Sequence, residues 1–103
     1  MVFDLIGLQP RNEKGKCFST NMWGWQRLAE FVLSACQDCF KEGETEYWHT
    51  NDGQQVSEET ALMIAERLKE YLEDEATYRF SPEWEQYKGF AEFCENSGGF
   101  EIW

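Results

Sequence analysis

The sequence predicts an α+β fold in which two or three helices pack on a small antiparallel sheet or hairpin, within one compact domain covering residues 1–103. Apolar residues recur at helical spacing in the interior, short alternating segments lie at both chain ends, and glycine-containing turns separate them. The chain contains eight Phe, five Trp and four Tyr residues. These rings are enough to anchor a modest core in a domain of this size.

The first element expected is a strand at residues 1–8, because Val2 and Ile6 alternate with Phe3 and Leu5. The polar segment 11–16 then predicts a solvated loop or a hairpin turn. The sheet is therefore expected to begin at the N-terminus.

A first helix is predicted to begin after the N-cap candidates Ser19, Thr20 and Asn21 and to continue as far as Gly43. Its apolar residues follow helical spacing and include Trp25, Leu28, Val32, Ala35, Cys36 and Cys39. The pair Cys36-x-x-Cys39 would then lie within the helix and face the core.

Residues 46–56 predict the end of a strand at 47–50, followed by a tight turn in which Asp52-Gly53 supplies positive φ angles. Ser57 is expected to cap a second helix that reaches Asp74. Two carboxylates in its first turn suit the helix dipole.

A third helix is predicted to begin at Ser81-Pro82, because Pro fits the first helical position, and to end at Ser97-Gly98-Gly99. Residues 100–103 predict a last strand. Pairing this strand with residues 2–6 would protect both ends of the chain.

The charged residues are unevenly distributed, and the net charge is −11. Residues 1–41 contain four acidic and five basic residues, whereas residues 42–103 contain sixteen acidic and four basic ones. Such a charge repels nucleic acid and anionic membranes, and it attracts basic protein surfaces over a Debye length of about 8–10 Å. No run reaches the roughly 20 apolar residues that a membrane span needs.

The leading functional hypothesis is a non-enzymatic acidic protein-binding module that mimics the charge of a nucleic acid. It would dock on a basic partner, such as a nucleic-acid-binding protein or a defence protein. Helix carboxylates would attract the partner, a Trp would provide the desolvated anchor, and Arg67 and Lys69 are expected to relieve part of the acidic charge. The residues expected to form this surface are Glu66, Glu70, Glu73, Asp74, Glu75, Glu83, Glu85, Trp23 and Trp48.

A second hypothesis is a small-ligand binding protein that holds a nucleotide-like ligand in an aromatic pocket. One form of this hypothesis places the pocket at a homodimer interface. The residues expected to bind this ligand are Asn21, Trp23, Trp25, Arg27, Trp48, His49 and Asn51. Trp23 would lie about 200° from Trp25 around a helix, so it either packs beneath the N-terminal loop or stays exposed.

A third hypothesis is a structural or assembly subunit whose excess aromatic residues are buried between copies.

Neither an enzyme nor a cofactor is expected. His49 is the only histidine, and no phosphate-binding glycine loop, HExxH motif or nucleophile elbow accompanies it. Cys36, Cys39, His49 and Cys94 would provide four zinc ligands, but cysteines on the apolar side of a helix are more typical of small buried hydrophobic residues. The start of the chain lacks a basic n-region, so we expect a cytoplasmic protein with reduced thiols.

Four motifs distributed over the chain resemble a group of known sequences. They are Phe3-Asp-Leu-x-Gly-Leu-x-Pro10, Asn21-x-Trp-x-Trp25, Trp48-x-x-Asn-Asp-Gly-Gln54 and Phe93-Cys-x-x-Ser-Gly-Gly-Phe100. Together they resemble a family of small uncharacterised proteins found in bacteria and their phages. The resemblance implies a soluble, single-domain protein and carries no assigned activity. Small acidic proteins of phages often inhibit host defence proteins, and by analogy the resemblance implies such an inhibitor.

Overall fold

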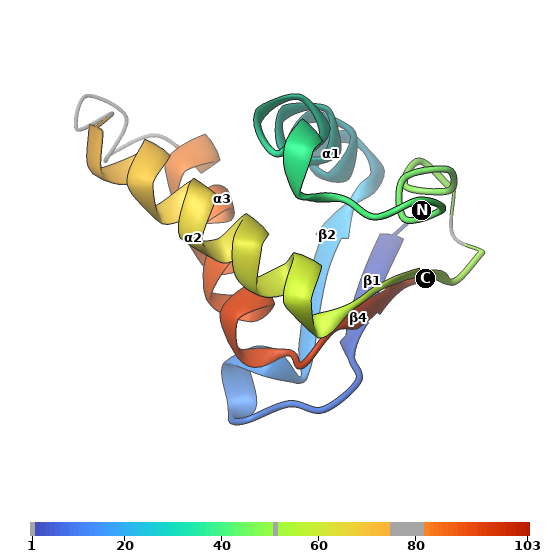
Figure 1. The fold of residues 1–103 in the computed structure, drawn as a ribbon. Coiled ribbons are helices and arrows are strands. Elements are labelled where there is room, and N and C mark those ends of the chain that lie inside the picture. The colour runs from blue at the N-terminus through green and yellow to red at the C-terminus, as the bar shows by residue number, and fades with distance from the viewer. Residues whose placement is uncertain (1, 51, 75–81) are drawn as a thin grey trace.

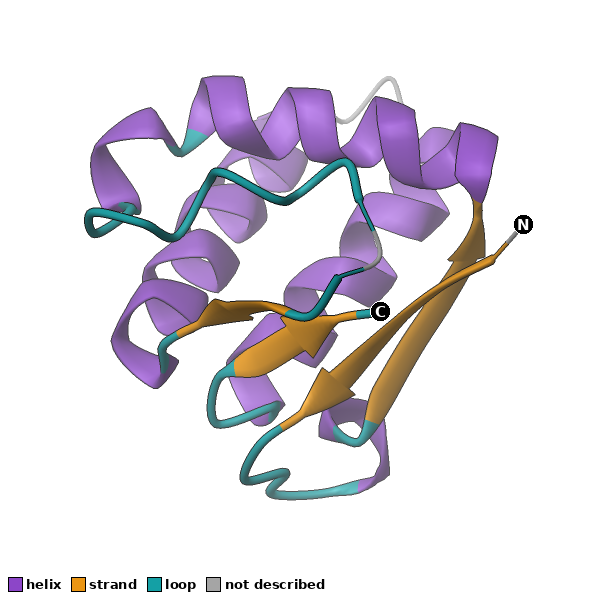
Figure 2. Ribbon diagram, turned by 90° about the vertical axis from the view of Figure 1, so that its right-hand side faces the viewer, coloured by secondary structure: helices purple, strands orange, loops and turns teal. Residues whose placement is uncertain are grey.

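The computed structural model describes residues 2–50, 52–74 and 82–103, without the side chains of residues 74 and 82–84. Three α-helices and a four-stranded antiparallel sheet confirm the predicted α+β fold. The elements are β1 (Val2–Gly7), the 3-10 helix η1 (Glu13–Gly15), β2 (Cys17–Asn21), α1 (Met22–Ala35), the 3-10 helix η2 (Gln37–Cys39), β3 (Gln54–Val56), α2 (Glu58–Asp74), α3 (Pro82–Asn96) and β4 (Phe100–Ile102). The strand order is β2-β1-β4-β3, and the helices lie on one side of the sheet (Figure 2).

The strands at the two chain ends, both expected from the sequence, pair with each other at the centre of the sheet (Figure 1). Strand β4 runs antiparallel to β1, with Leu5 opposite Ile102. The backbone N–H of Trp103 also donates to the Asp4 carbonyl at 2.7 Å. This pairing removes both terminal strands from the sheet edges, where unpaired backbone groups would be exposed.

Strand β2 is a sheet edge that the sequence analysis missed. It pairs antiparallel with β1 and completes a hairpin around the loop predicted at residues 11–16. Only Phe18 and Thr20 are partly buried, and the three residues between and beside them are exposed. A single large apolar residue in five gives too weak an alternating pattern to indicate a strand.

Helix α1 is shorter than the sequence predicts. Asn21 caps it by accepting a backbone N–H at 2.7 Å, but the helix ends at Ala35. Arg67 of α2 donates to the Ala35 carbonyl at 2.8 Å, and this bond satisfies an acceptor that a longer helix would have used internally. Cys36 and Cys39 therefore lie at the end of the helix and in η2, not within a helix, although both are buried as predicted.

The described residues 40–50, 52 and 53 contain no strand, so the strand end predicted at 47–50 is wrong. Trp48 is fully buried, and its indole N–H donates to the Glu44 carbonyl at 2.6 Å. Its own carbonyl accepts the indole N–H of Trp25, also at 2.6 Å. These bonds turn the backbone around the Trp48 ring, and the chain joins the sheet only at β3.

The core between the helices and the sheet is built largely from aromatic rings. Trp25 and Trp48 stack with their centroids 5.5 Å apart, and Phe100 meets Trp48 edge-on at 6.2 Å. Phe90 and Phe93 are also buried, at 0% and 1% exposure. Most of the described aromatic side chains are therefore buried in this core or packed against it, as the composition predicts.

We expect Trp48→Ala to lower the free energy of unfolding by about 3–5 kcal/mol, because it empties a large buried site. Urea unfolding followed by circular dichroism measures the change. Trp23→Ala is the matched control, since that ring is 69% exposed. The control should change stability by less than about 1 kcal/mol, and equal losses in the two variants would contradict the placement of the rings.

Candidate functional site

An acidic surface lies on one side of α2. Glu66, Glu70 and Glu73 are exposed there, and Leu62 and Met63 on the same side are 37% and 40% exposed. At 100° per residue these five side chains fall within an arc of about 100°. We call them the α2 stripe. The sequence predicts its three carboxylates, whereas it gives no sign of the two exposed apolar neighbours.

The cations of α2 do not neutralise this stripe, contrary to the expectation from the sequence. Arg67 donates two hydrogen bonds to the Asp38 carboxylate, at 2.8 and 2.9 Å, and these bonds lower the pKa of Asp38 to about 2. Lys69 pairs with Glu95 of α3. Within the described residues, no ion pair joins a stripe carboxylate to a cation.

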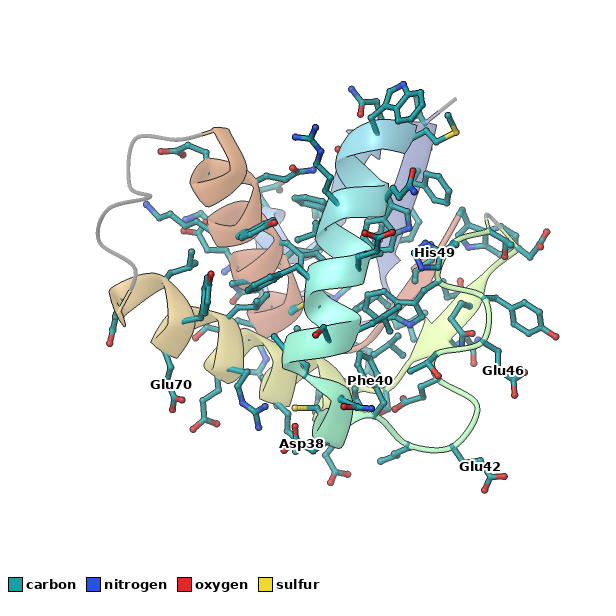
Figure 3. The ribbon with its side chains drawn as sticks, turned by 90° about the horizontal axis from the view of Figure 1, so that it is seen from above. Asp38, Phe40, Glu42, Glu46, His49 and Glu70 are labelled. Carbon is teal, nitrogen blue, oxygen red and sulfur yellow. The ribbon has the colours of Figure 1, made fainter. Side chains whose placement is uncertain are left out.

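A hollow of about 190 Å³ opens beside the stripe. It is lined by Met63, Glu66 and Glu70 of the stripe together with Arg67 and Cys39. Figure 3 shows Glu70 pointing away from the body of the molecule. The stripe therefore combines exposed charge with a shallow recess that has an apolar wall.

Among the other acids predicted for this surface, only the Glu85 side chain is described, and it lies on a different helix. Glu85 is exposed on α3, where the ion pair between Lys14 and Glu92 reduces the negative charge nearby. The side chains of Asp74 and Glu83, and residue Glu75 as a whole, lie outside the described residues.

Of the two predicted aromatic anchors, only Trp23 is exposed. It lies in the first turn of α1 beside Gly24, where an added Cβ would stand 2.5 Å from the Thr20 hydroxyl oxygen. Trp48 is 0% exposed, so its prediction as a surface anchor is wrong. Its burial depends on contacts with residues far away in the sequence, and a local pattern does not reveal them.

Two hollows lie one after the other along α1, and we call them together the α1 groove. The first, of about 360 Å³, is lined by Phe3, Met22, Trp25, Gln26, Glu30 and His49. The second, of about 490 Å³, is lined by Leu33 and Gln37 on one side and by residues 40–43 and 45 on the other. Figure 3 looks down on α1, with Phe40, Glu42 and His49 labelled beside it.

The first hollow contains two residues that the sequence predicts for a small ligand, Trp25 and His49. Trp25 is only 1% exposed, so little of its ring faces the hollow. Glu30 adds a carboxylate, which would repel the phosphates of a nucleotide.

Of the remaining residues predicted for that ligand, those that the structure describes do not line the hollow. The Asn21 side chain is occupied as the cap of α1. Arg27 is exposed on α1 and Trp48 is buried, and neither lines the first hollow. Asn51 lies outside the described residues.

Glu44 fixes the outer wall of the α1 groove. Its carboxylate accepts the N–H groups of Lys41 and Ser57 at 2.7 and 2.8 Å and the hydroxyl of Thr60 at 2.6 Å. Burial opposes ionisation of Glu44, but these hydrogen bonds outweigh burial and lower its pKa. The Gln54 side chain bonds two further backbone groups of the same segment. An irregular segment is thereby attached firmly to α2 and β3.

The cysteines are free, and three of the four are buried. Burial raises the pKa of Cys36 to about 12 and also raises the pKa of Cys39 and Cys94. His49 lines the first hollow of the α1 groove, whereas Cys39 lines the hollow beside the α2 stripe. In the described part of the chain, no group of three or more His, Cys, Asp or Glu residues is placed to hold a metal ion.

No protein-family model, curated protein or solved structure matches this chain. The resemblance to the family from bacteria and phages stays a prediction. Within residues 2–50, 52–74 and 82–103, no helix combines the length and the apolar character needed to cross a membrane.

We expect one thiol of the native protein to react quickly with a chromogenic aromatic disulfide at about pH 8. Cys17 is exposed, whereas burial and raised pKa values keep the other three cysteines protonated and inaccessible. Their labelling should be slower by a factor on the order of 100 or more. Cys17→Ser should remove the fast phase alone. A second fast thiol would contradict the buried placement.

We expect Glu44→Gln to lower stability by about 1–3 kcal/mol near neutral pH, because buried donors lose a charged acceptor. Folding lowers the pKa of Glu44, so its contribution is present above the unfolded-state pKa of about 4.3 and is lost as the pH falls through the folded-state value. Urea unfolding should therefore show a smaller difference in the free energy of unfolding between the variant and the parent protein at about pH 3 than at about pH 7. Glu42→Gln, at an exposed neighbour, is the control. A difference in unfolding free energy that does not change with pH would contradict the role given to Glu44.

Proposed function

We propose that this chain is a non-enzymatic protein-binding module that docks an acidic surface on a basic protein partner. The observation that carries the proposal is the α2 stripe, in which three exposed carboxylates, none in an ion pair within the described residues, lie beside two exposed apolar side chains. The carboxylates would attract a basic partner over a distance. The apolar pair and the adjoining hollow would supply the contact that loses water on docking.

The spacing of the stripe favours a partner that ordinarily binds nucleic acid. Glu66, Glu70 and Glu73 follow one another at about 4.5–6 Å along the helix axis. One DNA strand carries a charge about every 3.4 Å along its axis, so the linear charge density is comparable within a factor of two. The module would then act as an inhibitor that occupies a cleft lined with Lys and Arg. Its cytoplasmic location is part of the proposal, and the four free cysteines support it.

The two other hypotheses have less support. A nucleotide-like ligand in the first hollow would place its phosphates near Glu30. An assembly subunit would need surplus rings for its interfaces, but Trp25, Trp48 and Phe90 are already buried within one copy.

We expect Glu66→Gln/Glu70→Gln/Glu73→Gln to lose the capture of basic proteins from a bacterial lysate, because it removes the charge of the stripe and preserves its shape. The parent chain, immobilised, should retain such proteins at about 50 mM salt and release most of them at about 200 mM. Quantitative mass spectrometry should show at least about a tenfold drop for the variant at the lower salt concentration.

The control for this experiment is Glu13→Gln/Glu85→Gln/Glu101→Gln, which removes the same charge from other parts of the surface. It should capture the same basic proteins as the parent chain. Equal losses in the two triple variants would contradict the stripe as the docking surface. A parent chain that captures no basic protein at low salt would contradict the proposed function itself.

A further inference from the structure

We propose that the α1 groove binds an amphipathic segment of the partner protein that is rich in Lys or Arg. This inference rests on the proposed function and deepens it, because it adds a shaped site to the charged surface. The occupant is a peptide segment of another protein, chosen from the length of the groove, the apolar side chains in its lining and its charge.

The groove is long enough for a peptide segment because a single line of α1 residues borders both hollows. Met22, Gln26, Glu30, Leu33 and Gln37 recur at intervals of three or four residues, and the first four lie within α1. They occupy an arc of about 80°, and Met22 and Leu33 are about 17 Å apart along the axis. That length matches about three turns of a docked helix.

The lining of each hollow includes apolar side chains. Phe3 and Met22 contribute to the first hollow, and Leu33 and Phe40 contribute to the second. Two separate recesses with apolar side chains in their lining suit a segment that presents apolar side chains at intervals, as an amphipathic helix does.

The charge of the groove selects a basic segment. Glu30 lines the first hollow and Glu42 lines the second. Lys41 also lines the second hollow, but its ammonium group pairs with Glu59 at 3.0 Å. The lining of each recess therefore includes a carboxylate and apolar side chains, where the charged end and the stem of a Lys or Arg would both find contacts.

Trp23 extends this arrangement beyond the first hollow. It lies three residues before Gln26 and seven before Glu30, so the three side chains share one side of α1. Its ring is 69% exposed, more than any other large hydrophobic side chain in the described part of the chain. An exposed indole on the side of α1 that carries Glu30 suits a segment containing Arg, because a guanidinium stacks on rings and pairs with acids. Trp23 is therefore the aromatic contact of the groove.

The groove is formed before the partner arrives. Its outer wall is the segment fixed by the three hydrogen bonds to the Glu44 carboxylate and by the buried Trp48. A rigid wall avoids the entropy cost of ordering a loop on binding.

Fluorescence anisotropy with a labelled model peptide tests the inference. The probe is a helical peptide of about 14 residues made only of Lys and Leu, with Leu at intervals of three and four. At about 50 mM salt, Glu30→Gln/Glu42→Gln should weaken binding at least about tenfold. The matched variant Glu66→Gln/Glu70→Gln removes the same charge from the α2 stripe. It should change the affinity for the probe less than about threefold.

Two further arms separate shape from charge. Trp23→Ala should weaken binding of the probe at least about threefold, whereas Trp103→Ala should not, although Trp103 is also exposed. A peptide with Ser in place of Leu keeps every charge and should bind at least about tenfold more weakly. Circular dichroism checks that each variant remains folded.

The outcomes are distinct. Equal losses in the two double variants would mean that net charge alone holds the peptide, and this would overturn the groove while leaving the proposed function intact. A larger loss in the α2 variant would also overturn the groove and favour the stripe. No binding of the probe to the parent chain would overturn the inference. Lysate capture separately tests whether a basic partner exists.

Discussion

The burial of Trp48 is the constraint on which the rest of the structure depends. An indole N–H without a partner in the interior costs about 1–3 kcal/mol, so the ring can be buried only where an acceptor is built around it. The Glu44 carbonyl is that acceptor, and the Trp48 carbonyl receives the indole of Trp25 in turn. The Glu44 carboxylate then bonds the start of α2. One chain of contacts thus holds an irregular segment against two helices and the sheet.

Arg67 links the architecture to the acidic surface. By donating to the Ala35 carbonyl and to Asp38, it fixes where α1 ends and how the chain turns through η2. The same bonds hold the Arg67 guanidinium against Asp38 and the end of α1. Within the described residues, the carboxylates of the α2 stripe therefore form no ion pair, because Arg67 on their own helix pairs with Asp38 of a neighbouring element.

The sequence predicts the elements whose signals are local and misses the features that depend on distant contacts. The terminal strands, α2 and α3 follow from alternation, helical spacing and caps, all within a few residues. The end of α1 depends on Arg67, 32 residues beyond Ala35, and the burial of Trp48 depends on Trp25, 23 residues before it. The stripe carboxylates share one helix and could be predicted. The groove joins α1 to a segment that meets it only in the fold, although the spacing from Met22 to Leu33 was a usable signal.

The placement of the ion pairs gives a physical reason to regard the exposed acids as functional. Four of the five ion pairs within the described residues join different segments of the fold, as between Lys14 and Glu92 or Lys41 and Glu59. Most of these cations therefore lie where segments meet, while exposed acids such as those of the α2 stripe repel one another. Self-repulsion of this kind destabilises a compact chain of net charge −11. A partner that brings Lys and Arg to those acids would relieve the repulsion. This relief would contribute to the favourable free energy of docking.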